Sequence, residues 1–206
     1  MTPSTRLFTA ALLAGALALP ALVSPTDAAL RPPAKAPDFT LQASKAGQEF
    51  QFSLADALKK GPAVVYFYPA AFTQGCNIEA NAFATNIAKF EAVGATIIGV
   101  SQDSIERLNA FSADPAYCAG KFPVASDAGG AVAKSFDLTA REGRPGMKDS
   151  RGEELAAGTM FTERTTFVIN QSGEVVATLS SNEDKVTPYE HAEKSLAVVQ
   201  ELAKNK

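Results

Sequence analysis

A cysteine, a threonine and a proline stand together at one point of the sequence where their side chains could do redox chemistry. Cys76, one of two cysteines in the chain, falls in the first turn of a predicted helix that follows a predicted buried strand. Backbone N–H groups in a first turn have no partner within the helix, and the helix dipole favours an anion, so the position favours a thiolate. Thr73 is within hydrogen-bonding reach of that sulfur, and Pro69, which has no N–H to donate, can cover it. The pattern predicts a reactive thiol at Cys76.

A thiolate needs a cationic partner, and Arg164 is the best placed candidate. It begins a predicted strand that should lie near the strand before Cys76, where a guanidinium would favour the thiolate and donate in a fork to oxygen atoms. The alternative is a surface charge at a strand end. His191, the only histidine, is interpreted as a surface residue of the last helix, which weakens a Cys–His pair. The other charged candidates are expected to be solvated: Glu79 in the helix of Cys76, and Arg141, Arg144 and Arg151 in a long polar segment.

The segment around Cys76 has the pattern of a strand–helix–strand unit. Residues 63–68 form a continuous apolar run of β-forming side chains, typical of a strand buried on both faces. Apolar side chains then recur at helical spacing over 75–92, and residues 95–100 form a second buried strand. Two strands joined by a helix over this length are expected to be parallel.

The remaining elements complete an α/β pattern. Residues 165–170 and 174–179 flank Gln-Ser-Gly, a hairpin signature, and an amphipathic helix follows over 188–203. Short strands are predicted over 38–41 and 49–52. Residues 139–163 are polar and without a clear period, as in long loops that are often functional or mobile. The order of elements predicts a thioredoxin-like fold, in which a central mixed sheet is flanked by helices and extended by N-terminal β-strands.

The amino-terminal residues have the pattern of a secretory signal peptide. An apolar run over 7–23 is followed by small residues in the spacing of a cleavage site, which predicts a signal peptide over 1–28. Export to the periplasm or the exterior is expected, and a retained membrane anchor is the alternative. Residues 29–37 are proline-rich and are predicted to form an extended linker. One domain over 38–206 remains, in line with the usual domain length.

The charge of the chain argues against two classes of partner. The net charge is −3 at pH 7, and no basic block occurs in the sequence. Neither nucleic acid nor an anionic membrane is therefore expected as a partner, and no membrane contact is expected once the signal peptide is cleaved.

Four stretches resemble one known family, the peroxiredoxins of the AhpC/TSA superfamily. Pro-Ala-Ala-Phe-Thr-Gln-Gly-Cys over residues 69–76 matches the family signature of Pro, three residues, Thr or Ser, two residues and Cys. Gly-Val-Ser-Gln-Asp-Ser over 99–104, Phe-Pro-Val-Ala-Ser-Asp over 122–127 and Arg-Thr-Thr-Phe-Val-Ile over 164–169 resemble later family blocks in the same order. Phe-Tyr-Pro over 67–69 and a glutamate three residues after the cysteine are most similar to the bacterioferritin-comigratory, or Q-type, subgroup.

The resemblance implies a thiol-dependent peroxidase. By that resemblance Cys76 attacks the peroxide O–O bond and becomes a sulfenic acid. Thr73 and Arg164, with the Cys76 backbone N–H, would bind the peroxide and match the charge of the transition state, while Pro69 shields the sulfur. The expected partners are a peroxide substrate and a thioredoxin-like or other thiol reductant. A monomer or homodimer without cofactor or metal is expected.

The second cysteine departs from the commonest pattern of the subgroup. The family's usual second position, five residues after the first, is Asn81 here, and the only other thiol is Cys118. The resemblance implies that Cys118 resolves the Cys76 sulfenic acid as an intramolecular disulfide, as in a minority of relatives. Two alternatives stay open: a one-cysteine peroxidase with Cys118 as a buried bystander, and a non-catalytic domain with a structural disulfide. A thiol–disulfide exchanger is disfavoured because the chain has no Cys-x-x-Cys.

Overall fold

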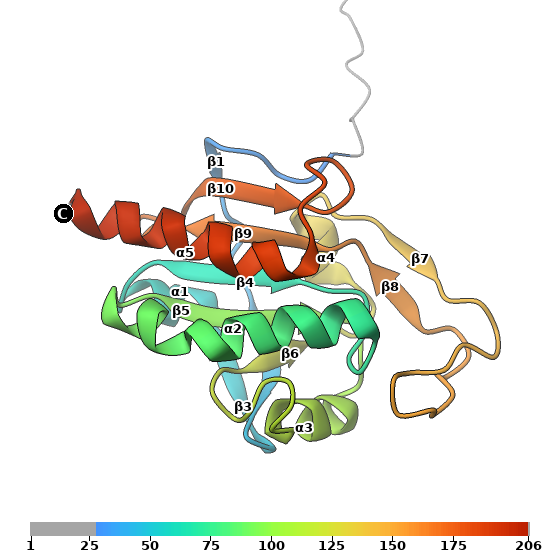
Figure 1. The fold of residues 1–206 in the computed structure, drawn as a ribbon. Coiled ribbons are helices and arrows are strands. Elements are labelled where there is room, and N and C mark those ends of the chain that lie inside the picture. Colours follow the sequence, from blue (N-terminus) through green and yellow to red (C-terminus); the bar gives the residue numbers. More distant parts are fainter. Residues whose placement is uncertain (1–27, 206) are drawn as a thin grey trace, which may run out of the picture.

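A central sheet with helices on both faces forms the molecule (Figure 1). The computed structural model describes residues 28–205, so the predicted signal peptide lies outside the described residues except for Ala28. Within the described part of the chain, no helix is long and apolar enough to cross a membrane. The predicted α/β class with a mixed central sheet is confirmed.

The main sheet has eight strands in the order β1-β10-β9-β4-β5-β6-β2-β3. In chain order these are β1 (Ala34–Lys35), β2 (Thr40–Lys45), β3 (Gln48–Ser53), β4 (Ala63–Phe67), β5 (Thr96–Ser101), β6 (Val124–Ser126), β9 (Thr165–Ile169) and β10 (Glu174–Ser180). Strands β4, β5 and β6 are parallel, whereas β9 pairs antiparallel with both β4 and β10. The predicted parallel unit and the predicted hairpin are therefore both confirmed. A second, two-stranded sheet consists of β7 (Ala140–Glu142) and β8 (Met160–Thr162).

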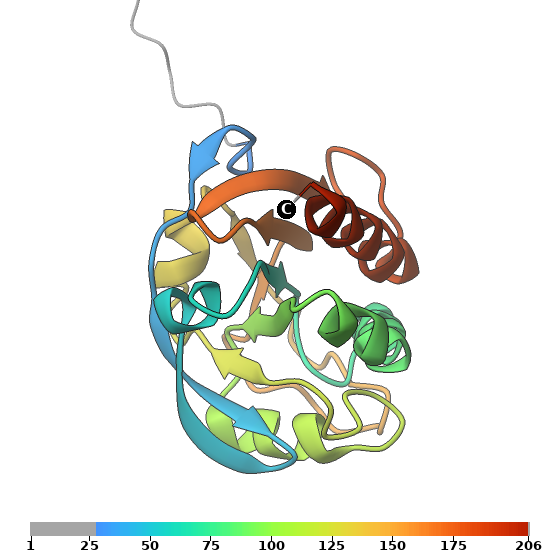
Figure 2. The same ribbon diagram turned by 90° about the vertical axis from the view of Figure 1, so that its left-hand side faces the viewer.

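Among residues 28–205, five helices cover the main sheet. They are α1 (Leu54–Leu58), α2 (Gln74–Ala92), α3 (Ile105–Ala113), α4 (Ala131–Ser135) and α5 (Pro188–Lys204). Helices α2 and α5 lie side by side on one face, and α1 and α4 lie on the other (Figure 2). This arrangement divides the core into two layers, one on each side of the sheet.

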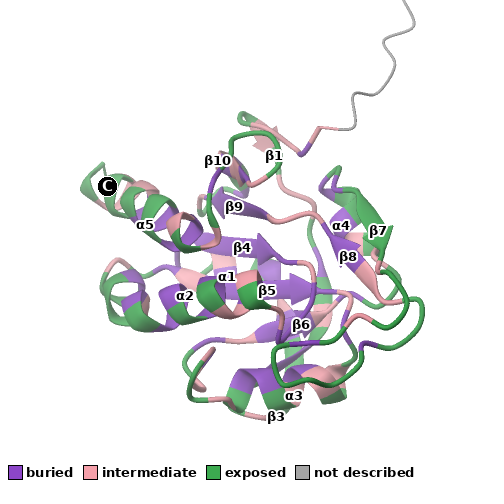
Figure 3. Cartoon of the chain, turned by 45° about the vertical axis from the view of Figure 1, so that its right-hand side comes forward, coloured by how far each residue is buried: buried purple, intermediate pink, exposed green. Residues whose placement is uncertain are grey.

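Strand β4 shows why the sheet needs cover on both faces. All five of its residues are buried, and the central strands are buried as a group (Figure 3). Val64 and Tyr66 belong to the cluster under α2 and α5, whereas Val65 and Phe67 belong to the cluster under α1 and α4. Alternate side chains point to opposite faces of a strand, so a continuous apolar run supplies both layers.

Two N-terminal predictions need correction. The strands predicted over 38–41 and 49–52 lie at 40–45 and 48–53, and only Ala46 and Gly47 form the turn between β2 and β3, both with positive φ (52° and 76°). Such two-residue turns match the twist of the strands they join. Residues 29–37 are not a free linker, because β1 pairs with β10 and Ala29 is buried against the α1 and α4 layer.

Candidate active site

Cys76 lies in the first turn of α2, just beyond the end of β4, as the sequence predicted. Its sulfur is buried and lies 3.0 Å from Thr73 Oγ1. Thr73 is the N-cap of α2, yet its side chain makes no capping hydrogen bond; its hydroxyl lies between the sulfur and the Ala70 carbonyl oxygen, 2.9 Å away. Because the hydroxyl has a single proton, it can donate to the carbonyl while the thiol donates to it, or turn that proton to a thiolate.

Arg164 supplies the cation at the same sulfur. Its Nη2 atom lies 3.3 Å from Cys76 Sγ. The pairing of Thr165 with Phe67 in β9 and β4 brings the preceding arginine to the end of β4 at which α2 begins. Gly75 leaves room for the guanidinium, because a Cβ on that residue would lie 3.0 Å from Nη2. The predicted set of Cys76, Thr73 and Arg164 is thus brought together.

Glu79 and His191 are buried in this site, so the predictions of a solvated acid and a surface histidine are wrong. Glu79 is wholly buried and forms an ion pair with Arg164 Nη1, and burial raises its pKa to about 7. Burial opposes the charge of Arg164, but Glu79 and Cys76 outweigh it and raise the pKa of the guanidinium. His191 Nδ1 lies 2.8 Å from Thr166 Oγ1 and 3.7 Å from a Glu79 oxygen.

Helical spacing carried a signal for both residues. Glu79 is one turn after Cys76 and therefore shares its face of α2, which is turned toward the sheet. His191 is followed by Ser195 and Val199 at intervals of four residues, and all three are buried where α5 packs on α2. The flanking glutamates, Glu190 and Glu193, suggested solvent, but neither is among the buried residues of α5.

Pro69 lies just beyond the end of β4, four residues before Thr73. It is half-buried and, together with Arg164, lines a cavity of about 270 Å³. Phe161 and Arg141 line the same cavity, with the Arg141 guanidinium 5.5 Å from the centre of the Phe161 ring. Among residues 28–205 no group of three or more His, Cys, Asp or Glu side chains is arranged to hold a metal ion. The side chains that donate to the Cys76 sulfur are the hydroxyl of Thr73 and the guanidinium of Arg164.

Residues 32–178 match the AhpC/TSA family, a stretch that covers most of the chain and includes Pro69, Thr73, Cys76, Glu79 and Arg164 but not His191. This chain belongs to the AhpC/TSA family of peroxiredoxins. The peroxiredoxin is 32% identical over 141 residues to peroxiredoxin Bcp of Xanthomonas campestris, an alignment that covers 68% of this chain and 78% of the relative. The resemblance seen in the signature stretches is confirmed, and with it the assignment as a thiol-dependent peroxidase.

Two solved structures share the fold. The peroxidoxin BcpB of Mycobacterium tuberculosis has a TM-score of 0.66 and 29% identity, over 83% of this chain and 97% of that one. Peroxiredoxin Q of Xanthomonas campestris has a TM-score of 0.62 and 30% identity, over 86% and 99% of the two chains. The predicted thioredoxin-like fold of the peroxiredoxin is confirmed by these likenesses.

Cys118 is a free and fully buried thiol. It follows α3 and belongs to the same core cluster as Cys76, but no disulfide joins the two in this structure. Burial, with a smaller contribution from Asp114, raises the pKa of the Cys118 thiol well above its ordinary value. The segment is attached to α2 by a hydrogen bond of 3.0 Å from Asn81 Nδ2 to the Ala116 oxygen. In this state, Cys118 is a poor nucleophile.

The long segment between β7 and β8, residues 143–159, packs against the loop that precedes Cys76. Ser150 donates from its backbone N–H and its hydroxyl to the Phe72 oxygen, at 2.8 and 2.7 Å. Asn77 in α2 donates to the same hydroxyl at 2.8 Å. The polar segment that the sequence left without a role therefore supports the residue next to Thr73.

Two arginines lie against the Phe72 ring. The guanidinium of Arg151 lies 3.5 Å from the ring centroid and that of Arg107 lies 5.2 Å from it. Asp149 accepts hydrogen bonds of 2.9 Å from both. We call Arg107, Asp149, Ser150 and Arg151 the site clamp. Phe72 has a positive φ of 61°, a conformation that a bulky residue adopts only where its surroundings impose it.

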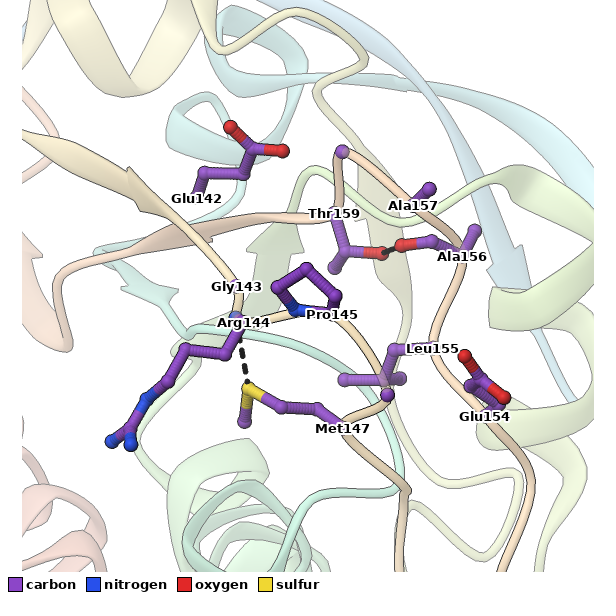
Figure 4. A pocket seen from close by; sticks show the side chains of 12 residues that line it. Glu142, Gly143, Arg144, Pro145, Met147, Glu154, Leu155, Ala156, Ala157 and Thr159 are labelled. Atoms are coloured by element: carbon purple, nitrogen blue, oxygen red, sulfur yellow. Dashed lines mark hydrogen bonds between the residues drawn. The ribbon is translucent and has the colours of Figure 1, made fainter.

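A second, smaller cavity lies within the clamp segment itself. Figure 4 shows it between Pro145 and Met147 on one limb and Leu155 and Ala156 on the other, with a volume of about 110 Å³. Met147 Sδ accepts a hydrogen bond from the Arg144 backbone at 3.3 Å across this turn. None of the predicted site residues lines this cavity.

Proposed function

We propose that Cys76 reduces hydrogen peroxide and organic hydroperoxides through a sulfenic acid, which Cys118 then resolves as an intramolecular disulfide. The observation that carries the proposal is the pair of donors, Thr73 Oγ1 at 3.0 Å and Arg164 Nη2 at 3.3 Å, directed at one buried sulfur. A thiolate there would be stabilised by both, and both could turn to peroxide oxygens as charge moves along the O–O axis.

The first step follows from this geometry. The thiolate attacks one peroxide oxygen, an S–O bond forms as the O–O bond breaks, and the other oxygen leaves as hydroxide or alkoxide and takes a proton. The cavity lined by Pro69 and Arg164, about 270 Å³, has room for an organic substituent. A solved structure of the Xanthomonas campestris bacterioferritin comigratory protein, 30% identical, is named for alkyl peroxide reduction, which supports the same substrate class here.

The second step requires Cys118 to leave its buried position. Its thiolate would attack the Cys76 sulfur, the S–S bond would form, and the hydroxide released would take the thiol proton as water. Ala119 and Gly120, with φ of 52° and 66°, make the adjoining turn, and two side-chain hydrogen bonds tie the segment to α2, from Asn81 to the Ala116 oxygen and from Lys121 to the Ala84 oxygen. An external thiol, thioredoxin-like or other, then supplies two electrons to restore both thiols.

Two alternatives to resolution by Cys118 are a one-cysteine peroxidase and a structural disulfide. In a one-cysteine peroxidase the external thiol would attack Cys76 directly, and the complete burial of Cys118 is the observation that favours it. A structural disulfide would leave a non-catalytic domain.

We also propose that the protein is exported to the periplasm or the exterior, with cleavage after residue 28. Detection of a mature chain beginning near Ala29 in the exported fraction tests the cleavage. We propose that the mature protein is a monomer or a homodimer.

Stopped-flow consumption of peroxide by the reduced protein tests the proposal. We expect one fast equivalent consumed by the wild type and none by Cys76→Ser. Cys118→Ser should keep the fast equivalent but retain a sulfenic acid that dimedone labels, whereas the wild type should lose that label as the disulfide forms. Undiminished consumption by Cys76→Ser contradicts the peroxidase proposal. Equal dimedone labelling of wild type and Cys118→Ser contradicts resolution by Cys118.

A further inference from the structure

One guanidinium serves two buried acidic groups in this site. Arg164 directs Nη1 to Glu79 and Nη2 to the sulfur of Cys76. Both acids are buried, and both lie on the same face of α2, three residues apart. A cation shared in a medium of low dielectric stabilises one anion less when the other is also charged. The ionisation of Glu79 and that of Cys76 are therefore coupled through Arg164.

The hydrogen bonds of His191 fix its tautomer. Ser181 Oγ lies 2.7 Å from the Val186 carbonyl oxygen and 3.0 Å from His191 Nε2. A carbonyl can only accept, so the single hydroxyl proton goes to Val186, and Nε2–H must donate to Ser181. Thr166 then donates to Nδ1, at 2.8 Å. Burial, reinforced by Arg164 and Lys194, lowers the pKa of His191 to about 3, so the ring is neutral.

This tautomer leaves Glu79 with one oxygen that has no donor. Glu79 Oε2 is paired with Arg164, but Oε1 is buried without any hydrogen-bond partner. His191 Nδ1 lies 3.7 Å from it, but the lone pair of that nitrogen already accepts from Thr166. A half-satisfied carboxylate in a dry site is destabilised relative to its protonated form, in keeping with the pKa of about 7 for Glu79, which burial raises.

We propose that His191 is a positioning residue of this peroxiredoxin: by withholding a donor from Glu79 Oε1, it limits how strongly Glu79 competes with Cys76 for Arg164. The inference rests on the proposed function of Cys76 as the reacting thiol. A fully satisfied, permanently charged Glu79 would take a larger share of the guanidinium. A neutral Glu79 leaves that charge to the sulfur.

Other charged groups near the pair do not replace this coupling. Tyr66 on β4 faces Glu79, but burial raises the pKa of its hydroxyl well above 10, so it is neutral. On α5, Lys194 and Glu190 influence His191 with opposite sign and form an ion pair with each other at 3.2 Å. Arg164, immediately before β9, is the cation that contacts both members of the pair. Burial and the charge of Arg164 act on the ionisation of Glu79 in opposite directions, and burial is the larger.

The ultraviolet absorbance of the thiolate, followed against pH in Cys118→Ser protein, tests the proposal without any peroxide. In His191→Asn a side-chain amide N–H₂ takes the place of Nδ1 and can donate to Glu79 Oε1. We expect the midpoint of thiolate formation to move to higher pH, with a roughly three- to tenfold lower thiolate-to-thiol ratio at fixed pH. Ser195→Ala, one turn along the same buried helix face, is the matched control and should leave the midpoint unchanged.

Glu79→Gln is the second variant. It keeps an oxygen that accepts from Arg164 but removes the competing charge, so thiolate should form at lower pH than in the wild type. In that background His191→Asn should have no further effect, whereas a merely structural role would lower stability and shift the curve equally in both backgrounds. An unchanged or higher midpoint in Glu79→Gln overturns the proposal, as does an equal shift with and without Glu79. If Cys76 failed to consume peroxide, the proposed function would fall, but this titration would still report on the coupling.

Discussion

Replacing Thr73 by valine should remove one defined interaction from the reacting sulfur. Valine has the shape of threonine without the hydroxyl, and that hydroxyl lies 3.0 Å from Cys76 Sγ. A hydrogen bond to a charged group contributes about 1.5–3 kcal/mol. If the bond is made to the thiolate and to the transition state, its loss lowers the second-order rate with peroxide by about 10- to 150-fold.

The same substitution should have little effect on folding. Thr73 makes no side-chain capping bond to α2, so the usual loss on removing an N-cap of about 1 kcal/mol does not apply. The Ala70 carbonyl keeps the backbone N–H of Thr73 as a donor, at 3.4 Å. We therefore expect the free energy of unfolding to fall by less than about 1 kcal/mol.

Stopped-flow kinetics with hydrogen peroxide, alongside urea unfolding, measure the two quantities on the same protein. Thr73→Ser keeps the hydroxyl and should retain the rate within about threefold, a difference of less than 1 kcal/mol. A rate for Thr73→Val within twofold of the wild type would refute the assignment of Thr73 as a donor to the sulfur. A large loss of stability with a proportionate loss of rate would show that the residue acts through folding instead.

Three further predictions follow from the geometry. Gly75→Ala places a Cβ 3.0 Å from Arg164 Nη2. It should slow the peroxide reaction in stopped flow by about tenfold or more, while the free energy of unfolding changes by less than about 1 kcal/mol. A rate equal to that of the wild type would contradict a close approach of Gly75 and the Arg164 guanidinium. Arg151→Ala removes the cation over the Phe72 ring and should lower the free energy of unfolding by about 1 kcal/mol, with faster amide exchange in the loop before Cys76. The control variant Arg144→Ala, at an exposed position, should change that free energy by less than about 0.5 kcal/mol. Equal behaviour of the two variants would contradict a stabilising role for the site clamp. Burial raises the pKa of Glu79 from 4.5 to about 7, so the contribution of its protonated form to stability is fully present below pH 4.5 and is lost as the pH rises through 7. In urea unfolding, the stability of Glu79→Gln relative to the wild type should therefore increase across that window, by up to about 3 kcal/mol. A constant difference would mean that Glu79 ionises normally.

The sequence was informative where the pattern is local. The apolar run of β4 predicts a strand buried on both faces, and the switch to helical spacing after Pro69 predicts where α2 begins. The spacing of Thr73 and Cys76 places hydroxyl and sulfur on one turn, which the structure confirms at 3.0 Å. These are interactions over three or four residues, for which helical geometry leaves few alternatives.

Contacts between distant parts of the chain were not predictable in the same way. The burial of Glu79 and His191 depends on the packing of α5 against α2, which one amphipathic pattern alone does not specify. The site clamp joins Phe72 to residues 107 and 149–151, and its polar sequence is that of an ordinary exposed loop. The paired edge position of β1 was missed for a similar reason, since two residues carry no periodicity.

A peptide-mapped mass spectrum of the reduced protein after one equivalent of hydrogen peroxide shows whether Cys76 is the reacting thiol and whether Cys118 resolves it. We expect the peptide containing Cys76 to be modified in every oxidised molecule, and most of it to be joined to the Cys118 peptide by a disulfide. A lone sulfenic acid at Cys76 would retain the peroxidase and reject Cys118 as its partner. An unmodified Cys76 after the peroxide has been consumed would contradict the account.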